Sequence, residues 1–314
     1  MRSSDSSGGG GATSFTGAQV YPYDPRNDDV RVYVNGQFFH RSQAMVSVFD
    51  SGFAMGDGVW EGVRLIDGRL VALDEHLDRL FDGLSAINLD LALDRQAVAA
   101  AIRTTVDMNG MRDGVHIRLM VTRGPKRTPS QDPRFALGKP TMVIVAEHKA
   151  LIPTATRAGL KLLTATFRCS TPDVFDLRLN SHSRLNLIQA LIQALNAGCD
   201  EALMLDQRGF VASCNSTNFF IVRDKELWTS TGAYNFKGIT RRKTIELYTE
   251  EMGEVREKDF TLAEVYSADE AFVTGTLGGI TPVAFVDGRR IGDGQVGPVT
   301  RAIGQSYLQR IIKA

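Results

Sequence analysis

The sequence predicts an α+β protein built from two halves, and three observations support this fold class. Stretches with strand-like alternation and stretches with helix-like spacing occur in groups, without the regular strand–helix–strand order of a parallel sheet. Asn35-Gly36 and Asp67-Gly68 each separate two alternating stretches, which predicts hairpins. A Pro-containing break near residue 150 divides the pattern, and 314 residues are enough for two domains.

The same pattern divides the chain into four segments. Residues 1–29 are predicted to form a flexible N-terminal tail and a surface arm, because the first sixteen contain SSGGGGATS and no apolar stretch like that of a signal peptide. We expect a small α+β domain over residues 30–150 and a large one over residues 158–314. Residues 151–157 are the expected linker, and the ligand site is expected in the cleft between the domains.

In the first half, local patterns predict two hairpins, two helices and two further strands. Asp74 is a plausible N-cap of the first helix, whose apolar residues recur at helical spacing. The long loop between the last two strands is of a length that is usually functional or disordered. The predicted elements are the hairpins 30–39 and 63–73, the helices 74–87 and 94–110, and the strands 115–124 and 140–148.

The second half repeats the mixture of strands and helices. One predicted helix ends before Gly198 and has an apolar face that includes Leu185, Ile188 and Leu195. The predicted elements are strands at 160–167, 201–206 and 218–230, helices at 183–197 and 241–253, then two strands and a terminal helix from about Gly297.

Composition excludes several classes of function. Lys plus Arg equals Asp plus Glu at 36 each, so no net charge favours nucleic acid or a membrane surface. The three cysteines are widely spaced and form no Cys-x-x-Cys pair, which argues against a disulfide framework and against a zinc site. We therefore expect a cytoplasmic protein without a bound metal.

Seven segments, in order, resemble the class IV (fold-type IV) pyridoxal-phosphate (PLP) aminotransferases, which include branched-chain aminotransferase, D-amino-acid aminotransferase and aminodeoxychorismate lyase. The resemblance covers roughly residues 30–310 and implies their two-domain, D-amino-acid-aminotransferase-like fold. The segments are FAMGDGVWEGVRLIDG, DEHLDRL, DEALMLDQRGFV, the strand that starts at Asn218, GITRRKTIEL, DEAFVTGTLGGITPV and VGPVTRAIGQ.

The resemblance implies a cradle for the phosphate of PLP or of pyridoxamine phosphate (PMP). Gly238, Ile239 and Thr240 open a helix, where free backbone N–H groups and a hydroxyl suit an anion. Thr276 matches a second phosphate-binding turn, and Arg64 matches an arginine that the family uses for phosphate. By themselves these residues would be interpreted as a helix cap and a surface ion pair. Phe236 falls where the family places an apolar residue against the cofactor ring, although a core aromatic residue is equally consistent.

The sequence departs from the family at two chemically important positions. The family's Schiff-base lysine aligns with Asn180, and slips of one or two residues would place Leu179 or Arg178 there. An internal aldimine is therefore not expected, because a Schiff base needs a primary amine. The glutamate that pairs with the pyridine nitrogen aligns with Ser213, which supplies no counter-charge and leaves the ring a weaker electron sink.

Other residues are candidates for the missing roles. His182 could carry a proton, because its side chain titrates near neutrality, or it could cap a helix. Lys237, beside the phosphate turn, could bring an amine near the ring. Lys126 and Arg127, in the loop after the Thr122-Arg123-Gly124 turn, could hold a substrate carboxylate or be a solvated charge pair.

The sequence leaves three functions open. The first is an atypical transaminase or lyase that binds PLP or PMP non-covalently and acts on an amino acid, an amine or a keto acid. The second is a PLP-independent enzyme that reuses the scaffold for another anionic ligand, and the third is a non-catalytic pseudo-enzyme. The resemblance also implies a homodimer, with the FAMGDGVW segment at its interface.

Overall fold

A computed structural model describes residues 17–313, so the predicted tail, residues 1–16, lies outside the described part of the chain. The first half forms a six-stranded antiparallel sheet in the order β2-β1-β6-β5-β3-β4. Its strands are β1 (Arg31–Val34), β2 (Gln37–His40), β3 (Gly58–Ile66), β4 (Arg69–Val71), β5 (Val115–Thr122) and β6 (Thr141–His148). Both predicted hairpins are present, with Asn35 and Asp67 at positive φ.

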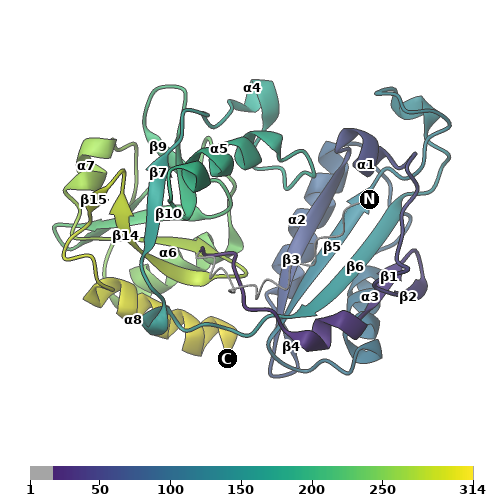
Figure 1. The fold of residues 1–314 in the computed structure, drawn as a ribbon, viewed down its shortest axis with the longest axis horizontal. Coiled ribbons are helices and arrows are strands. Elements are labelled where there is room, and N and C mark those ends of the chain that lie inside the picture. The colour runs from purple at the N-terminus through teal and green to yellow at the C-terminus, as the bar shows by residue number, and fades with distance from the viewer. Residues whose placement is uncertain (1–16, 314) are drawn as a thin grey trace, which may run out of the picture.

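Helices cover one face of this sheet and leave the other for the second half of the chain (Figure 1). Apolar residues of α2 (Leu73–Ala86) and α3 (Arg95–Met108) pack on alternate residues of β3, β5 and β6 to form one core. The intervening residues of β3, which include Trp60, Gly62 and Arg64, point the other way. The remaining short elements are η1 (Pro25–Asp29), α1 (Ser51–Met55) and η2 (Pro133–Phe135).

The second half forms a nine-stranded mixed sheet that curls until β9 meets β10, where the Cys214 N–H donates to the Thr217 carbonyl. Its strands are β7 (Leu160–Thr164), β8 (Glu201–Leu205), β9 (Val211–Cys214), β10 (Asn218–Arg223), β11 (Glu226–Thr229), β12 (Val255–Glu257), β13 (Glu270–Gly275), β14 (Gly279–Val286) and β15 (Arg289–Arg290). Its helices are η3 (Thr154–Thr156), α4 (Pro172–Phe175), α5 (Leu185–Asn196), α6 (Ile239–Glu251), α7 (Leu262–Tyr266), α8 (Pro298–Tyr307) and η4 (Leu308–Ile312).

Side-chain alternation along the curled sheet builds separate cores. Phe219 and Ile221 of β10 face the inside of the curl, whereas Phe220 and Val222 pack with residues of α6 and α8 outside it. Ala202 and Met204 of β8 pack with the buried alanines of α5. Helices α5, α6 and α8 therefore pack on the outside of the curled sheet; this second half is called the large domain and the first half the small domain.

Three local expectations need correction. Helix α2 has Ala72, at φ +52°, as its N-cap, and Asp74 lies in its first turn, where its charge still favours the helix N-terminus. The apolar face predicted for the helix before Gly198 is not buried: Ala190 and Ala194 pack on the sheet, and Leu185 is 68% exposed. The predicted surface arm also contains Ala18, whose side chain is buried in the core inside the curl.

A short segment of the large domain pairs with the free edge of β3. The Trp60 N–H donates to the Asn180 carbonyl at 2.9 Å, and the His182 N–H donates to the Gly58 carbonyl at 3.0 Å. Strand β4 pairs only with the second half of β3, which leaves this edge available. Asn180, the predicted lysine position, is therefore held against the small domain by backbone hydrogen bonds.

Candidate active site

A cavity of about 680 Å³ lies between the two domains, and residues from both line it. The small-domain wall comes from β3 and β5, where Trp60 pairs with Met120 and Gly62 with Arg118, so that all four side-chain positions share one face. His116 adds an imidazole to this wall, and a Cβ at Gly62 would lie 2.9 Å from its Nε2. Glycine at position 62 therefore leaves room for the imidazole.

On the large-domain wall, the predicted phosphate turn opens into the cavity. Gly238 is the N-cap of α6 and offers no side-chain acceptor, so the first backbone N–H groups of the helix stay available to a ligand. Asn218 shapes the turn, because its Nδ2 donates to the Phe236 carbonyl at 2.7 Å. A Cβ at Gly238 would lie 2.4 Å from the Asn218 Oδ1, which explains why glycine is needed there.

The structure brings most of the predicted site residues to this one cavity. The lining includes the predicted lysine and glutamate positions, the predicted proton carrier, the predicted ring contact and both predicted phosphate turns: Asn180, His182, Ser213, Phe236, Gly238, Ile239, Thr240 and Thr276. Four predicted residues are not among the lining residues: Arg64, Lys126, Arg127 and Lys237.

Arg64 lies behind the cavity wall and not on it. Its side chain is 1% exposed, and none of its three guanidinium nitrogens has a hydrogen-bond partner among residues 17–313. Its Cζ lies 6.0 Å from the centre of the Tyr21 ring, and burial lowers the pKa of the guanidinium. Burial raises the pKa of Tyr307. A 3.4 Å contact between its hydroxyl and the Thr240 Oγ1, and the charge of Arg64, partly oppose this rise. Tyr307 thus contacts the predicted phosphate turn through Thr240.

Arg79 of α2, which was not among the predicted site residues, reaches the predicted phosphate turn directly. Its Nη1 donates to the Lys237 carbonyl at 3.2 Å, and its Cζ lies 4.3 Å from the centre of the Phe236 ring. Two further nitrogens bond to Glu61 at 2.7 and 2.8 Å. Burial would raise the pKa of Glu61, but Arg79 and His76 outweigh it and hold the pKa at about 2. Arg79 is the arginine of the DEHLDRL motif, and this motif is the sequence feature that could have identified it as a site residue.

Asn180 and Ser213, the predicted lysine and glutamate positions, are both engaged in hydrogen bonds. The Asn180 Nδ2 donates to the Trp60 carbonyl at 2.5 Å, and its Oδ1 accepts a hydrogen bond from Arg184. Ser213 donates its hydroxyl proton to the Thr217 carbonyl at 2.8 Å, so it could only accept a hydrogen bond from a ligand. Neither side chain supplies an amine or a negative charge.

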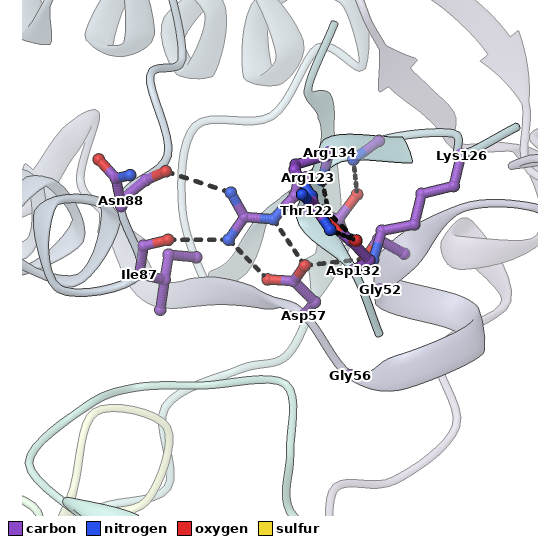
Figure 2. Close-up of polar contacts among 12 residues, drawn as sticks. Gly52, Gly56, Asp57, Ile87, Asn88, Thr122, Arg123, Lys126, Asp132 and Arg134 are labelled. Atoms are coloured by element: carbon purple, nitrogen blue, oxygen red, sulfur yellow. Dashed lines mark hydrogen bonds and ion pairs between the residues drawn. The ribbon is translucent and has the colours of Figure 1, made fainter. Parts of the chain in front are cut away.

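The remaining candidates differ in their access to the cavity. Burial lowers the pKa of His182, whose buried Nε2 has no hydrogen-bond partner in the described part of the chain, so a neutral imidazole faces the site. Lys237 is exposed, and so is Arg127. The Lys126 Nζ donates to the Ser130 carbonyl at 2.8 Å, in the region of the Asp57–Arg123 contact (Figure 2). Among the described residues, no lysine lines the cavity.

A buried carboxyl group also lines the cavity. Glu201 accepts hydrogen bonds from the Ala18 N–H at 3.1 Å and from the Thr217 hydroxyl at 2.8 Å. Burial raises the pKa of Glu201 to about 7 in spite of these donors. Burial also raises the pKa of the neighbouring Cys214 thiol well above its usual range, which keeps that thiol protonated.

Comparison with known proteins places this fold and cavity in a family. The model of the amino-transferase class IV family matches residues 58–286. Branched-chain-amino-acid aminotransferase-like proteins 1 and 2 of Arabidopsis thaliana are each 40% identical over 90% of this chain. The chain spans about half the length of these two relatives. The branched-chain-amino-acid aminotransferase of Pseudomonas aeruginosa is 33% identical over 89% of this chain and 92% of its own length.

A solved structure of a branched-chain aminotransferase has a similar fold. The branched-chain amino acid aminotransferase from Thermoproteus uzoniensis, with norvaline, has a TM-score of 0.81 at 28% identity and covers 90% of this chain and 95% of its own. The chain therefore belongs to the class IV aminotransferase family, and the predicted fold class is confirmed. Within residues 17–313, no helix has the length and apolar character needed to cross a membrane.

Proposed function

We propose that this protein binds PLP or PMP non-covalently and acts on an amino acid, an amine or a keto acid as an atypical member of its family. The observation that supports this most directly is the shared cavity: the open N-terminus of α6, Thr276 and Arg79 all line it, and so does Asn180, where an amine would be needed. The donors fit a phosphate dianion. The rest of the site does not fit a Schiff base to the protein.

Different residues of this chain would bind the phosphate, contact the ring and accept a proton. Backbone N–H groups of Ile239 and Thr240, with Arg79, hold the phosphate, and the buried charge of Arg64 behind the cavity wall adds to the attraction for an anion. Phe236 packs against the ring. The ring, when bound, supplies the electron-withdrawing group through which amino groups are transferred. His182, neutral in its buried position, is a group able to accept a proton at its Nε2.

The geometry also supports a second candidate, in which the scaffold binds another anionic ligand without PLP, either as an enzyme or as a non-catalytic binding protein. The observation in its favour is that Asn180 and Ser213 are both engaged in hydrogen bonds within the protein. Binding of PMP separates the two candidates, because PMP needs no lysine. Calorimetric titration that shows no binding of PMP at high micromolar concentration would favour the second candidate.

Borohydride reduction tests the absence of a covalent bond. The purified protein is mixed with PLP, its absorption spectrum is recorded before and after reduction, and peptides are mapped by mass. We expect no pyridoxyl adduct at position 180 or at Lys237, which is exposed and does not line the cavity. Asn180→Lys is the matched variant, because it places an amine in the cavity and is expected to give an adduct at position 180. An adduct on Lys237 of the unaltered protein would overturn the proposal.

Two further expectations belong to this proposal. The homodimer implied by the resemblance is supported by the exposed apolar residues of α1 and α5, such as Phe53 and Leu185. A cytoplasmic location is supported by the three free cysteines, none of which pairs with another.

A further inference from the structure

Four residues beyond the missing lysine, Arg184 extends into the cavity in a fixed position. Its Nε donates to the Ser181 carbonyl at 3.1 Å, and its Nη2 donates to the Asn180 Oδ1. Its Cζ lies 5.1 Å from the centre of the Trp60 ring and 5.9 Å from that of the Phe236 ring. Two acceptors and two aromatic rings therefore restrict a side chain that would otherwise be flexible.

Cations and rings alternate along the cavity wall. Arg79 packs on Phe236, Arg184 lies near Phe236 and Trp60, and the Arg118 Cζ lies 3.7 Å from the centre of the Trp60 ring. Of the three arginines, Arg79 pairs with Glu61. Within the described residues, neither Arg118 nor Arg184 forms an ion pair.

Two unpaired guanidinium groups in a partly desolvated cavity create a strong preference for an anion. Burial and then the charges of Arg118 and Arg79 lower the pKa of Arg184 to about 10, so it remains charged at neutral pH. The planar fork of a guanidinium matches a carboxylate, to which it can donate two parallel hydrogen bonds. The phosphate turn lies at the Arg79 end of the same wall, so one ligand could place an anionic group at each end.

We propose that Arg184 binds a carboxylate of the ligand beside Arg118, and that Asn180 is a positioning residue that holds Arg184 for this task. The substitution at the lysine position thus converts a site for covalent capture into part of a carboxylate subsite. The cavity is then suited to an amino acid or keto acid joined to, or stacked beside, a phosphorylated ring. This inference rests on the proposed function for the identity of the ring, but not for the carboxylate subsite.

Calorimetric titration with three probes tests the subsite. PMP has a phosphate and no carboxylate, N-(5'-phosphopyridoxyl)-L-glutamate has both, and glutarate has carboxylates alone. Arg184→Gln is expected to weaken binding of the conjugate and of glutarate by about tenfold or more, and binding of PMP by less than about threefold. Asn180→Ala should weaken binding of the conjugate and of glutarate by a smaller factor, because Arg184 remains but is no longer held in position.

Two more variants make the result decisive. Arg178→Gln removes the same charge two residues from Asn180. Because Arg178 is paired with Asp176 outside the cavity, this variant should bind all three probes as the unaltered protein does. Arg184→Lys keeps the charge, loses the fork and should retain part of the affinity for the conjugate. If Arg184→Gln weakens the binding of PMP and of the conjugate equally, or weakens neither, the carboxylate subsite is overturned. If PMP fails to bind the unaltered protein, the proposed cofactor is wrong, and the glutarate titration alone then decides the role of Arg184.

Discussion

Glu201 is a carboxyl group that folding moves from water into the wall of the cavity. Its pKa in the folded protein is about 7, above its ordinary value of 4.5, because burial outweighs the hydrogen bonds from Thr217 and Ala18. The folded state therefore keeps a proton that the unfolded state releases as the pH rises from 4.5 to about 7. The free energy of unfolding should fall through that window.

We expect Glu201→Gln to remove this pH dependence, because the amide cannot ionise. Relative to the variant, the unaltered protein should lose roughly 2–3 kcal/mol of stability between about pH 5 and pH 8. Urea unfolding of both proteins across that range measures the difference. Parallel curves for the two proteins would show that Glu201 stays charged in the folded state.

At the scale of elements, Arg123 joins three parts of the small domain (Figure 2). It bonds to both oxygens of Asp57, at 2.7 and 3.0 Å, and donates to the carbonyls of Ile87 and Asn88 at the end of α2. Burial would raise the pKa of Asp57, but the hydrogen bonds from Arg123 and Ser51 outweigh it, and the pKa is lowered. Arg123 thus fixes the segment after α1 against the helix that supplies Arg79.

Removing the Arg123 side chain should lower the free energy of unfolding. Arg123→Ala leaves a partly buried carboxylate and two helix-end carbonyls without their partner, and we expect a loss of about 2–4 kcal/mol in the free energy of unfolding. Arg134→Ala is the matched control in the same region, because its pair with Asp132 is on the surface and Arg134 is 87% exposed. Denaturant unfolding compares them. Similar losses in the two variants would mean that Arg123 contributes no more than a surface pair.

At the scale of the whole molecule, apolar side chains are exposed on neighbouring elements of both domains. Val48 and Phe53, in and before α1, are 67% and 72% exposed, and Leu185 of α5 is 68% exposed. The Ser183 hydroxyl donates to the Gly56 carbonyl at 3.2 Å, which places the start of α5 beside the end of α1. Exposed apolar side chains on neighbouring elements are typical of a protein interface.

A second copy of the chain is the expected occupant of this surface. The unaltered protein should be a dimer by multi-angle light scattering at micromolar concentration, and Phe53→Glu combined with Leu185→Glu should shift it toward the monomer. Met108→Glu is the control, because it changes an exposed apolar residue at the end of α3 in the same way. A monomeric unaltered protein would contradict the dimer, and so would a dimer that survives the double substitution but not the control.

The sequence by itself determined the features that depend on neighbouring residues. Asn35-Gly36 and Asp67-Gly68 made both hairpins because these pairs accept positive φ. Gly238 ahead of a helix predicted an open helix N-terminus, since that arrangement is local to the chain. The absence of lysine near position 180 was also readable directly, because no fold can supply an amine that the chain lacks at that position.

Only the tertiary structure decided which distant side chains meet. Arg79, Arg118 and Arg184 come from three separate elements and gather around Trp60 and Phe236, and no local pattern records that meeting. Folding also placed Arg79 at the phosphate turn, Arg64 behind it, and the apolar face of α5 outside the core. Periodicity in a sequence reports which residues share a face, but the partner of that face is set by packing between segments that lie far apart in the chain.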